Sequence, residues 1–166
     1  MQERKLPVEE LLLPHLDGAY NLARWITESD ADAQIVVEEV YAQASKQEFG
    51  QEDARVRLLT IVRNRAYTWI RQHSGHSSPK DREESAGQSP PPLSGNKRTR
   101  DLHIALSKLA VELREILVLS EIEGWSYTQL ASALDLPMTG VTSRLRQARL
   151  RLRQEIAEAQ RKGLPE

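Results

Sequence analysis

One arginine-rich segment carries the side chains best suited to chemistry. Between positions 138 and 153 there are five arginines and no acidic residue, and short hydroxyl side chains stand among them. Arginine pairs with guanine or with phosphate, and Ser and Thr hydroxyls contact bases or phosphates. The segment therefore predicts a nucleic-acid-binding surface. The simpler alternative is an amphipathic helix whose basic face is only solvated.

The residues around this segment predict two helices joined by a tight turn. Ser126 is a suitable N-cap for a short helix over 127–134, with Gln129 at the reciprocal position of a capping box. The run Asp135-Leu136-Pro137 predicts the turn, and a long helix is expected over 139–161. These features, with the small Ala131 in the first helix, indicate a helix-turn-helix whose second helix enters the major groove. The expected apolar stripe of that second helix is Val141, Leu145, Ala148 and Leu152.

The rest of the chain predicts helices in two small domains. There is one Phe, so the cores must consist mainly of Leu, Ile, Val and Ala, which favours helices over sheets. Residues 73–100 are rich in Ser, Pro, Gly and charge, which predicts a flexible linker. The expected fold class is thus all-α, with helical domains over 8–72 and 101–162, the second of them containing the helix-turn-helix.

Helical periodicity also predicts the two cores. A first short helix should stop near Pro14, and a helix over 31–46 should begin with Asp30 or Asp32 as its cap. Trp25 and Trp125 are expected to pack between helices. The expected N-terminal core is Leu16, Tyr20, Ala23, Ile26, Ile35, Val36, Val40, Tyr41, Leu58, Ile61, Val62, Ala66, Trp69 and Ile70. The expected C-terminal core, before the helix-turn-helix, is Leu102, Ala105, Leu106, Leu109, Leu113, Ile116, Leu117 and Ser120.

Several other kinds of site are not expected. The chain has no Cys, which excludes disulfides and thiolate metal sites and fits the cytoplasm. The first residues are charged and interrupted by prolines, so neither a signal peptide nor membrane insertion is expected. The histidines show no metal-ligand spacing, and there is no Gly-rich phosphate loop or nucleophile motif. We therefore expect no metal, no cofactor and no enzymatic activity.

The motif that begins at Gly124 resembles that of a known family. It reads GWSYTQLASALDLPMTGVTSRLRQARLRLRQEI. It is similar to the C-terminal domain of bacterial sigma factors of the extracytoplasmic-function class, whose pattern is roughly G-x-S-Y-x-E-I-A-x-x-L-x-x-P-x-G-T-V-K-S-R-L-x-R-A-R-x-x-L. The segments YNLARWITESDADAQIVVEEVYAQA and RLLTIVRNRAYTWIR resemble the other domain of the same family. The resemblance spans about residues 10–160.

In the C-terminal domain, the resemblance implies contacts with the −35 promoter element. The sequence departs from the family pattern where Thr139-Gly140 inverts the usual Gly-Thr, and where Thr142, Gln147 and Gln129 replace a Lys, an Arg and a Glu. We therefore expect an unusual −35 sequence or weak binding. The implied DNA-binding residues are Thr139, Gly140, Thr142, Ser143, Arg144, Arg146 and Arg149.

In the N-terminal domain, the resemblance implies two further contacts. Glu38 and Glu39 match an acidic pattern that docks on core RNA polymerase, although Ile35 stands where the family has a carboxylate. Core packing is the competing expectation for Ile35. Arg63 and Asn64 match the residues that read the −10 element, beside a base-capturing loop over 49–55, while Arg57 stands where a Trp is usual.

The resemblance implies a sigma factor that directs core RNA polymerase to promoter DNA and is regulated by an anti-sigma factor. One alternative is a sigma-like protein without promoter activity that sequesters an anti-sigma factor, an interpretation motivated by the departures at Ile35, Arg57, Thr142 and Gln147. Another is a stand-alone helix-turn-helix regulator, which would leave residues 10–72 without a role.

Overall fold

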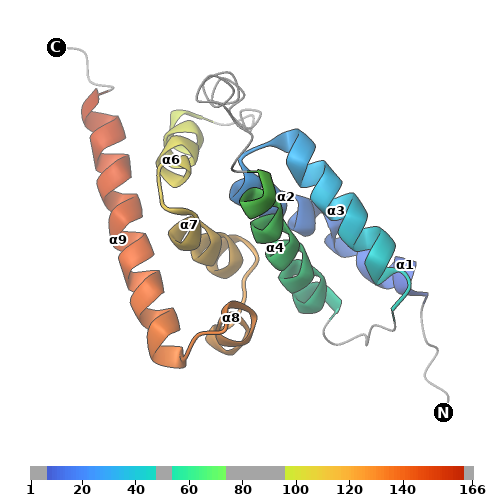
Figure 1. Cartoon of the computed structure of the whole chain (residues 1–166). Helices are drawn as coiled ribbons and strands as arrows, with labels where there is room; N and C mark the ends of the chain where they lie inside the picture. Colours follow the sequence, from blue (N-terminus) through green and yellow to red (C-terminus); the bar gives the residue numbers. More distant parts are fainter. Residues whose placement is uncertain (1–6, 48–53, 74–95, 163–166) are drawn as a thin grey trace. The chain divides into compact units, whose positions relative to one another are not determined.

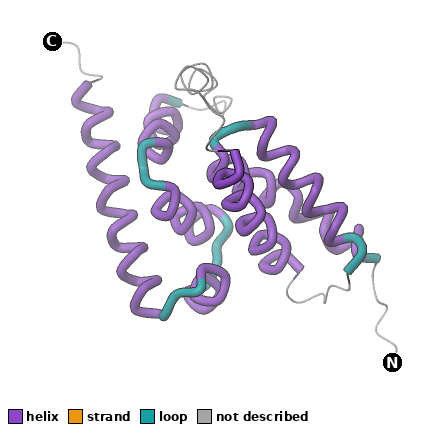
Figure 2. Tube along the Cα trace, in the orientation of Figure 1, coloured by secondary structure: helices purple, strands orange, loops and turns teal. Residues whose placement is uncertain are grey.

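The chain folds into α-helices that form two compact units (Figures 1 and 2). The computed structural model describes residues 7–47, 54–73 and 96–162, and these residues include no strand. The expected all-α fold class is confirmed. Most of the expected linker and most of the 49–55 loop lie outside the described residues, and each unit is described here by itself.

The N-terminal unit is built around three helices that pack on one another. Helix α1 (Val8–Leu12) leads through a 3-10 turn (Leu13–His15) into α2 (Leu16–Thr27), and α3 (Asp30–Ala44) and α4 (Ala54–His73) follow. Each of α2, α3 and α4 contacts the other two. Helix α1 ends at Leu12, near Pro14 as expected, and Pro14 lies at the start of the 3-10 turn that follows, where its missing N–H has no partner to lose.

The buried faces of these helices differ from the expected ones at several positions. The expected position Ile35 is 39% exposed and Ile61 is half-buried, whereas Ala33 and Leu59 are fully buried. Part of the difference comes from alanines such as Ala33. Their small side chains let the helices pack closely, but they mark the buried face of a helix less clearly than Ile or Leu does. The fully buried positions are Leu12, Ala19, Leu22, Ala23, Ala33, Val36, Val40, Ala44, Leu58, Leu59, Val62 and Ala66. Ile26 is buried as expected, while Leu16, Tyr20, Tyr41, Trp69 and Ile70 are half-buried.

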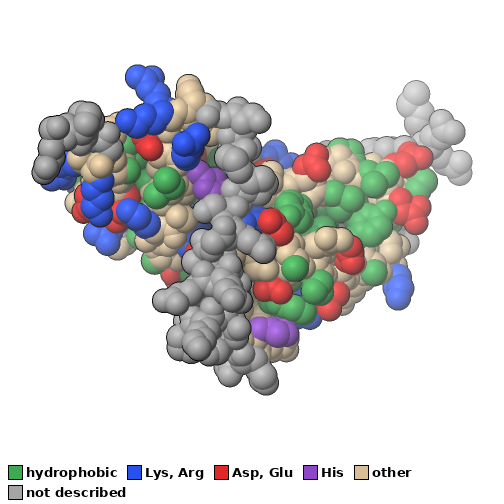
Figure 3. All heavy atoms as spheres, turned by 90° about the horizontal axis from the view of Figure 1, so that it is seen from above, with side chains coloured by type: hydrophobic (Ala, Val, Ile, Leu, Met, Phe, Trp, Pro, Cys, Tyr) green, Lys and Arg blue, Asp and Glu red, His purple; other side chains and the backbone are tan. Residues whose placement is uncertain are grey.

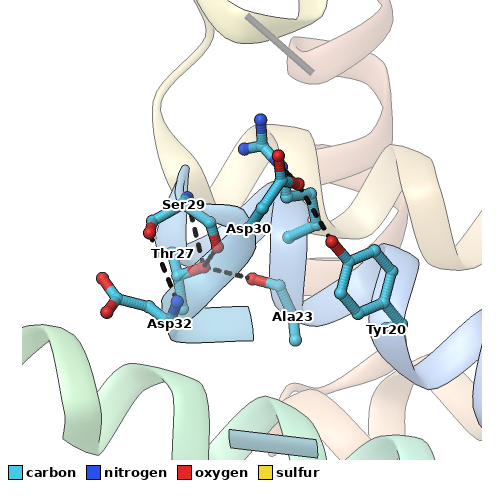
Figure 4. A network of polar contacts seen from close by, with 7 residues as sticks. Tyr20, Ala23, Thr27, Ser29, Asp30 and Asp32 are labelled. Atoms are coloured by element: carbon cyan, nitrogen blue, oxygen red, sulfur yellow. Dashed lines mark hydrogen bonds and ion pairs between the residues drawn. The ribbon is translucent and has the colours of Figure 1, made fainter. Parts of the chain in front are cut away.

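A polar network fixes the junction between α2 and α3 (Figure 4). The carboxylate of Asp30 accepts hydrogen bonds from the Tyr20 hydroxyl, at 2.9 Å, and from the buried Arg24 guanidinium. The N-cap of α3 is Ser29 rather than Asp30 or Asp32, and its hydroxyl accepts from the backbone N–H of Asp32 at 3.3 Å. The network therefore sets where α3 begins and joins that end of α3 to α2.

The C-terminal unit packs three shorter helical segments against one long helix. Helix α6 (Lys97–Ser107) is capped by Asn96, so it begins inside the expected linker. Helix α7 (Val111–Leu117) continues as a π-helical turn (Val118–Ile122), and α8 (Tyr127–Leu134) and α9 (Met138–Lys162) complete the unit. Helices α6, α7 and α8 all contact α9.

The core of this unit follows the expected stripes with three corrections. Leu102 is 40% exposed rather than buried, and Leu113 and Ser120 are half-buried. Trp125 is buried, as expected. The buried apolar positions are Ala105, Leu106, Leu109, Ile116, Leu117, Val118, Leu119, Trp125, Leu130, Leu134, Val141, Leu145 and Ala148.

Candidate nucleic-acid interface

The turn between α8 and α9 is fixed at both ends by local chemistry. At the start of α8 the Ser126 hydroxyl accepts from the Gln129 N–H at 3.2 Å, and the Gln129 side chain accepts from the Ser126 N–H at 2.9 Å. The predicted capping box is thus confirmed, because an amide accepts this bond as a carboxylate does. At the end of α8, Asp135 adopts the left-handed conformation that ends the helix (φ 52°).

Gly140 lets the first turn of α9 lie against this turn. A Cβ at Gly140 would meet Cδ of Pro137 at 3.3 Å, closer than ordinary van der Waals contact. Pro137 also accepts the first backbone hydrogen bond of α9, from Val141 at 3.0 Å. The inverted Thr139-Gly140 order therefore places the glycine where packing needs it, and Gly140 is half-buried.

The side chains of α9 divide into a buried stripe and an outward face. Val141, Leu145 and Ala148 are buried, as predicted, whereas Leu152, the fourth residue of the expected stripe, is half-buried. At about 100° per residue, Arg146 and Thr139 project roughly 130–150° from the middle of this stripe, and Ser143 lies nearly opposite to it. All three are exposed. Short hydroxyls and one arginine at the N-terminal end of a recognition helix are suited to base and phosphate contacts.

The other predicted residues of α9 lie elsewhere on the helix. Arg144 is half-buried and projects from the flank opposite to Arg146. The Thr142 hydroxyl donates within the helix to the carbonyls of Met138, at 3.2 Å, and Thr139, at 3.0 Å. It must rotate before it can donate a hydrogen bond to a ligand.

Arg149 is held by a residue from another segment. Its Nε and Nη2 donate to one carboxylate oxygen of Glu121, at 3.1 and 2.6 Å, and Glu121 belongs to the π-helical turn. Hydrogen bonds to Glu121 and to Tyr127 raise the pKa of Arg149 above its ordinary value. Glu121 and Tyr127 were not among the predicted site residues, because the carboxylate lies 28 positions from Arg149 and helical periodicity relates only near neighbours.

In the N-terminal unit, the predicted docking residues share one exposed face of α3. Ile35, Glu38 and Glu39 stand at i, i+3 and i+4, and all are exposed, so the core-packing expectation for Ile35 is wrong. Glu38 accepts a hydrogen bond from Gln34 at 2.8 Å. Glu39 forms an ion pair with Arg65 of α4 at 2.6 Å. The face thus combines one apolar side chain with two carboxylates, of which one accepts a hydrogen bond from Gln34 and the other is paired with Arg65.

Two rows of cationic and aromatic side chains run along α4. Arg63 donates to the side-chain oxygen of Asn64 at 3.1 Å, and its guanidinium lies 4.8 Å from the centre of the Tyr67 ring. Arg65 lies 5.5 Å from the centre of the Trp69 ring. The Trp69 ring stacks in turn on His73, with 4.0 Å between ring centroids. Sequence reasoning selected Arg63 and Asn64 but missed Arg65, whose partner Glu39 lies 26 positions away.

The two units also differ in surface charge. On the face shown in Figure 3, Lys and Arg side chains gather on the C-terminal unit, whereas Asp and Glu stand beside hydrophobic side chains on the N-terminal unit.

Among the residues that the structure describes, no three His, Asp or Glu side chains are placed to hold a metal ion. Within the same residues, no helix is long and apolar enough to span a membrane.

Comparison with known proteins gives a family match for most of the C-terminal unit and a more distant relative for most of the chain. Residues 99–152 match the family described as sigma-70, region 4. The chain is 27% identical over 158 residues to an ECF RNA polymerase sigma factor, SigE, of Mycolicibacterium smegmatis, which covers 90% of this chain. It spans 62% of the length of that relative.

A solved structure has the same fold. It is that of the sigma factor RpoE in complex with the anti-sigma factor NepR from Bartonella quintana. The TM-score is 0.70 at 23% sequence identity, and the match covers 90% of this chain and 96% of the solved one. Residues 99–152 therefore match sigma-70 region 4, and the expected resemblance of the chain to an extracytoplasmic-function sigma factor is found over most of its length.

Proposed function

We propose that this protein is a sigma factor that directs core RNA polymerase to specific promoters and assists transcription initiation in the cytoplasm. The observation that supports this proposal most strongly is the helix-turn-helix of α8 and α9, whose long helix exposes Thr139, Ser143 and Arg146 on one face. In this role the polymerase performs the chemistry, and the chain itself has no enzymatic activity and uses no cofactor.

In the C-terminal unit, α9 contacts the −35 element through its exposed N-terminal half. Thr139, Ser143 and Arg146 are the residues best placed to reach bases. Gly140 does not itself contact DNA. Its lack of a side chain lets the start of α9 pack closely against Pro137. Arg144 stands on the opposite flank, where it is suited to a backbone phosphate rather than a base.

In the N-terminal unit, α3 docks on core polymerase through Glu38 and Glu39, and α4 reads the −10 element through Arg63 and Asn64. The exposure of both carboxylates and of the Asn64 side chain supports this assignment. An anti-sigma factor is a further partner, by analogy with the solved complex of RpoE with NepR.

The test is in vitro transcription with core RNA polymerase, the full chain and a pool of promoter fragments. We expect transcripts from a defined subset of promoters, and these should be absent when the chain is omitted. A chain that neither binds core polymerase nor changes the transcript profile would contradict the proposal.

One observation favours a second candidate function, that of a sigma-like protein that only sequesters an anti-sigma factor. Ile35 presents an apolar side chain where the family has a carboxylate, and Glu39 is paired with Arg65. Under this alternative, a pull-down with core polymerase recovers none of the free chain, whereas the sigma-factor proposal requires its recovery.

A further inference from the structure

Three segments of the helix-turn-helix meet at the guanidinium of Arg149. Arg149 belongs to α9, Glu121 to the π-helical turn after α7, and Tyr127 is the first residue of α8. Glu121 accepts two hydrogen bonds from Arg149, and Tyr127 lies close enough to this side chain to contribute to its raised pKa. The Arg149 side chain thus links the recognition helix to the π-helical turn that precedes α8.

The position of Arg149 on α9 differs from that of the residues proposed to contact bases. Arg149 projects about 70° from the middle of the buried stripe, whereas Arg146 projects about 130°. It also lies nine residues beyond Gly140, which is about 13 Å along the helix axis. Base contacts in this class of motif come from the N-terminal residues of the recognition helix. Arg149 therefore faces the neighbouring segments more than it faces a ligand.

Besides the packing of α9 on α6, α7 and α8, two specific contacts far apart on α9 bear on the direction of its axis. The first is the close approach of Gly140 to Pro137 at the N-terminal end, and the second is the Arg149–Glu121 ion pair at 2.6 Å. Since the angle of the recognition helix determines which base edges its side chains reach, a change at the second contact alters DNA reading at the first turn.

We propose that Glu121 is a positioning residue that holds Arg149 as an internal clamp on the recognition helix, so that Arg149 orients α9 and does not contact DNA. This inference rests on the proposed function, because it assumes that α9 reads the −35 element. It departs from the sequence expectation, which assigned Arg149 to the DNA interface.

The clamp contributes little to the stability of the fold. Both partners are about half exposed, with side-chain exposures of 44% for Arg149 and 52% for Glu121, and exposed ion pairs are weakened by solvent and salt. Glu121→Gln and Arg149→Gln should therefore fold normally, and their main effect should be on the orientation of α9.

The decisive experiment measures promoter affinity for the full chain assembled with core polymerase, as a function of salt. Glu121→Gln and Arg149→Gln should each weaken binding by a similar factor, roughly three- to tenfold, and the double variant should be no weaker than either. The slope of log affinity against log salt should stay unchanged in all three. Arg153→Gln is the matched control, because it removes the same charge one turn further along the same side of α9 without touching Glu121.

A charge exchange distinguishes the clamp from a phosphate contact. In the Glu121→Arg, Arg149→Glu double variant the ion pair is re-formed, so the clamp predicts that promoter affinity recovers towards that of the wild type. If Arg149 instead contacts a phosphate, Arg149→Gln lowers the salt slope by about 0.9, Glu121→Gln tightens binding, and the exchange abolishes it. Any of these three results overturns the proposal.

The inference and the proposed function fail in different ways. A double-mutant cycle on promoter affinity, measured with the full chain and core polymerase, gives the coupling between positions 121 and 149 directly. A wild-type chain that binds no promoter overturns both the sigma-factor role and the DNA-reading role of the clamp. Promoter binding by the wild type with no coupling between the two positions overturns the clamp alone.

Discussion

The two units treat their proposed binding charges differently. On α9, Arg149 is paired with Glu121, but Thr139, Ser143 and Arg146 remain exposed beside it. On α3, Glu39 is paired with Arg65, and the remaining face consists of Glu38 and the apolar Ile35. Under the proposed function, α9 therefore separates its positioning charge from its contacting residues. The proposed docking face of α3 has no such separation, so a partner there must compete with an existing ion pair.

This difference predicts that single substitutions act more strongly in the C-terminal unit. The largest expected effect comes from Arg146→Ala, because a base-paired arginine contributes about 1–3 kcal/mol, or roughly five- to 150-fold in affinity. Promoter binding by the assembled polymerase is the measurement, with Arg161→Ala at the far end of α9 as the control. An unchanged affinity for every promoter in the pool would remove Arg146 from the interface.

A single substitution on the proposed docking face should raise the affinity for core polymerase, because Ile35 is the one exposed residue there that departs from the acidic family pattern. Ile35→Asp restores the carboxylate of the family pattern at a position that is already 39% exposed. We expect core polymerase to bind about two- to fivefold more tightly, since a further complementary charge at the edge of an interface mainly raises the association rate. Gln47→Glu, which adds the same charge beyond the end of α3, is the control.

The opposite outcome would be equally informative for the comparison. If Ile35→Asp weakens binding to core polymerase while Gln47→Glu does not, the apolar side chain itself forms the contact. The α3 face of this protein would then differ in kind from the acidic face implied by the family pattern.

Much of the fold could be predicted from the sequence, and the failures have a common cause. The bounds of α8, its capping box and the buried stripe of α9 follow from near neighbours along one helix, and they were predicted. The exposure of Ile35 depends instead on which side of α3 meets α2 and α4, where Ala33 allows close packing. The sequence pattern favours burial of the large apolar Ile35, and it does not indicate that the small Ala33 is buried instead.

The same limit applies to the candidate site. Residue types and motif positions selected Arg146, Glu39 and Arg149, but they did not show which of these charges form ion pairs between helical segments. The partners Glu121 and Arg65 lie 28 and 26 positions away from Arg149 and Glu39, so helical spacing does not reveal the pairs.

The smallest effect is expected at the junction that orients the docking helix. Tyr20→Phe removes the hydroxyl that donates to Asp30 and should lower the free energy of unfolding by about 1 kcal/mol, because the lost hydrogen bond is neutral to charged and only partly buried. The change should also reach α3, whose start the network fixes, and so weaken polymerase binding slightly. Chemical unfolding of the two proteins at neutral pH is the measurement, and Tyr41→Phe on the same unit is the control.

Alkaline pH gives this prediction a second test. Burial, followed by the hydrogen bond to Asp30 and the charge of that carboxylate, raises the pKa of Tyr20. A raised pKa means that the folded state binds this proton more tightly than the unfolded state does. The contribution of Tyr20 is therefore complete below about pH 10, the pKa of an unperturbed tyrosine, and is lost as the pH rises through the folded pKa. The stability difference between wild type and Tyr20→Phe should narrow over that range, whereas a difference that stays constant with pH would show that packing, rather than the Asp30 contact, carries the effect.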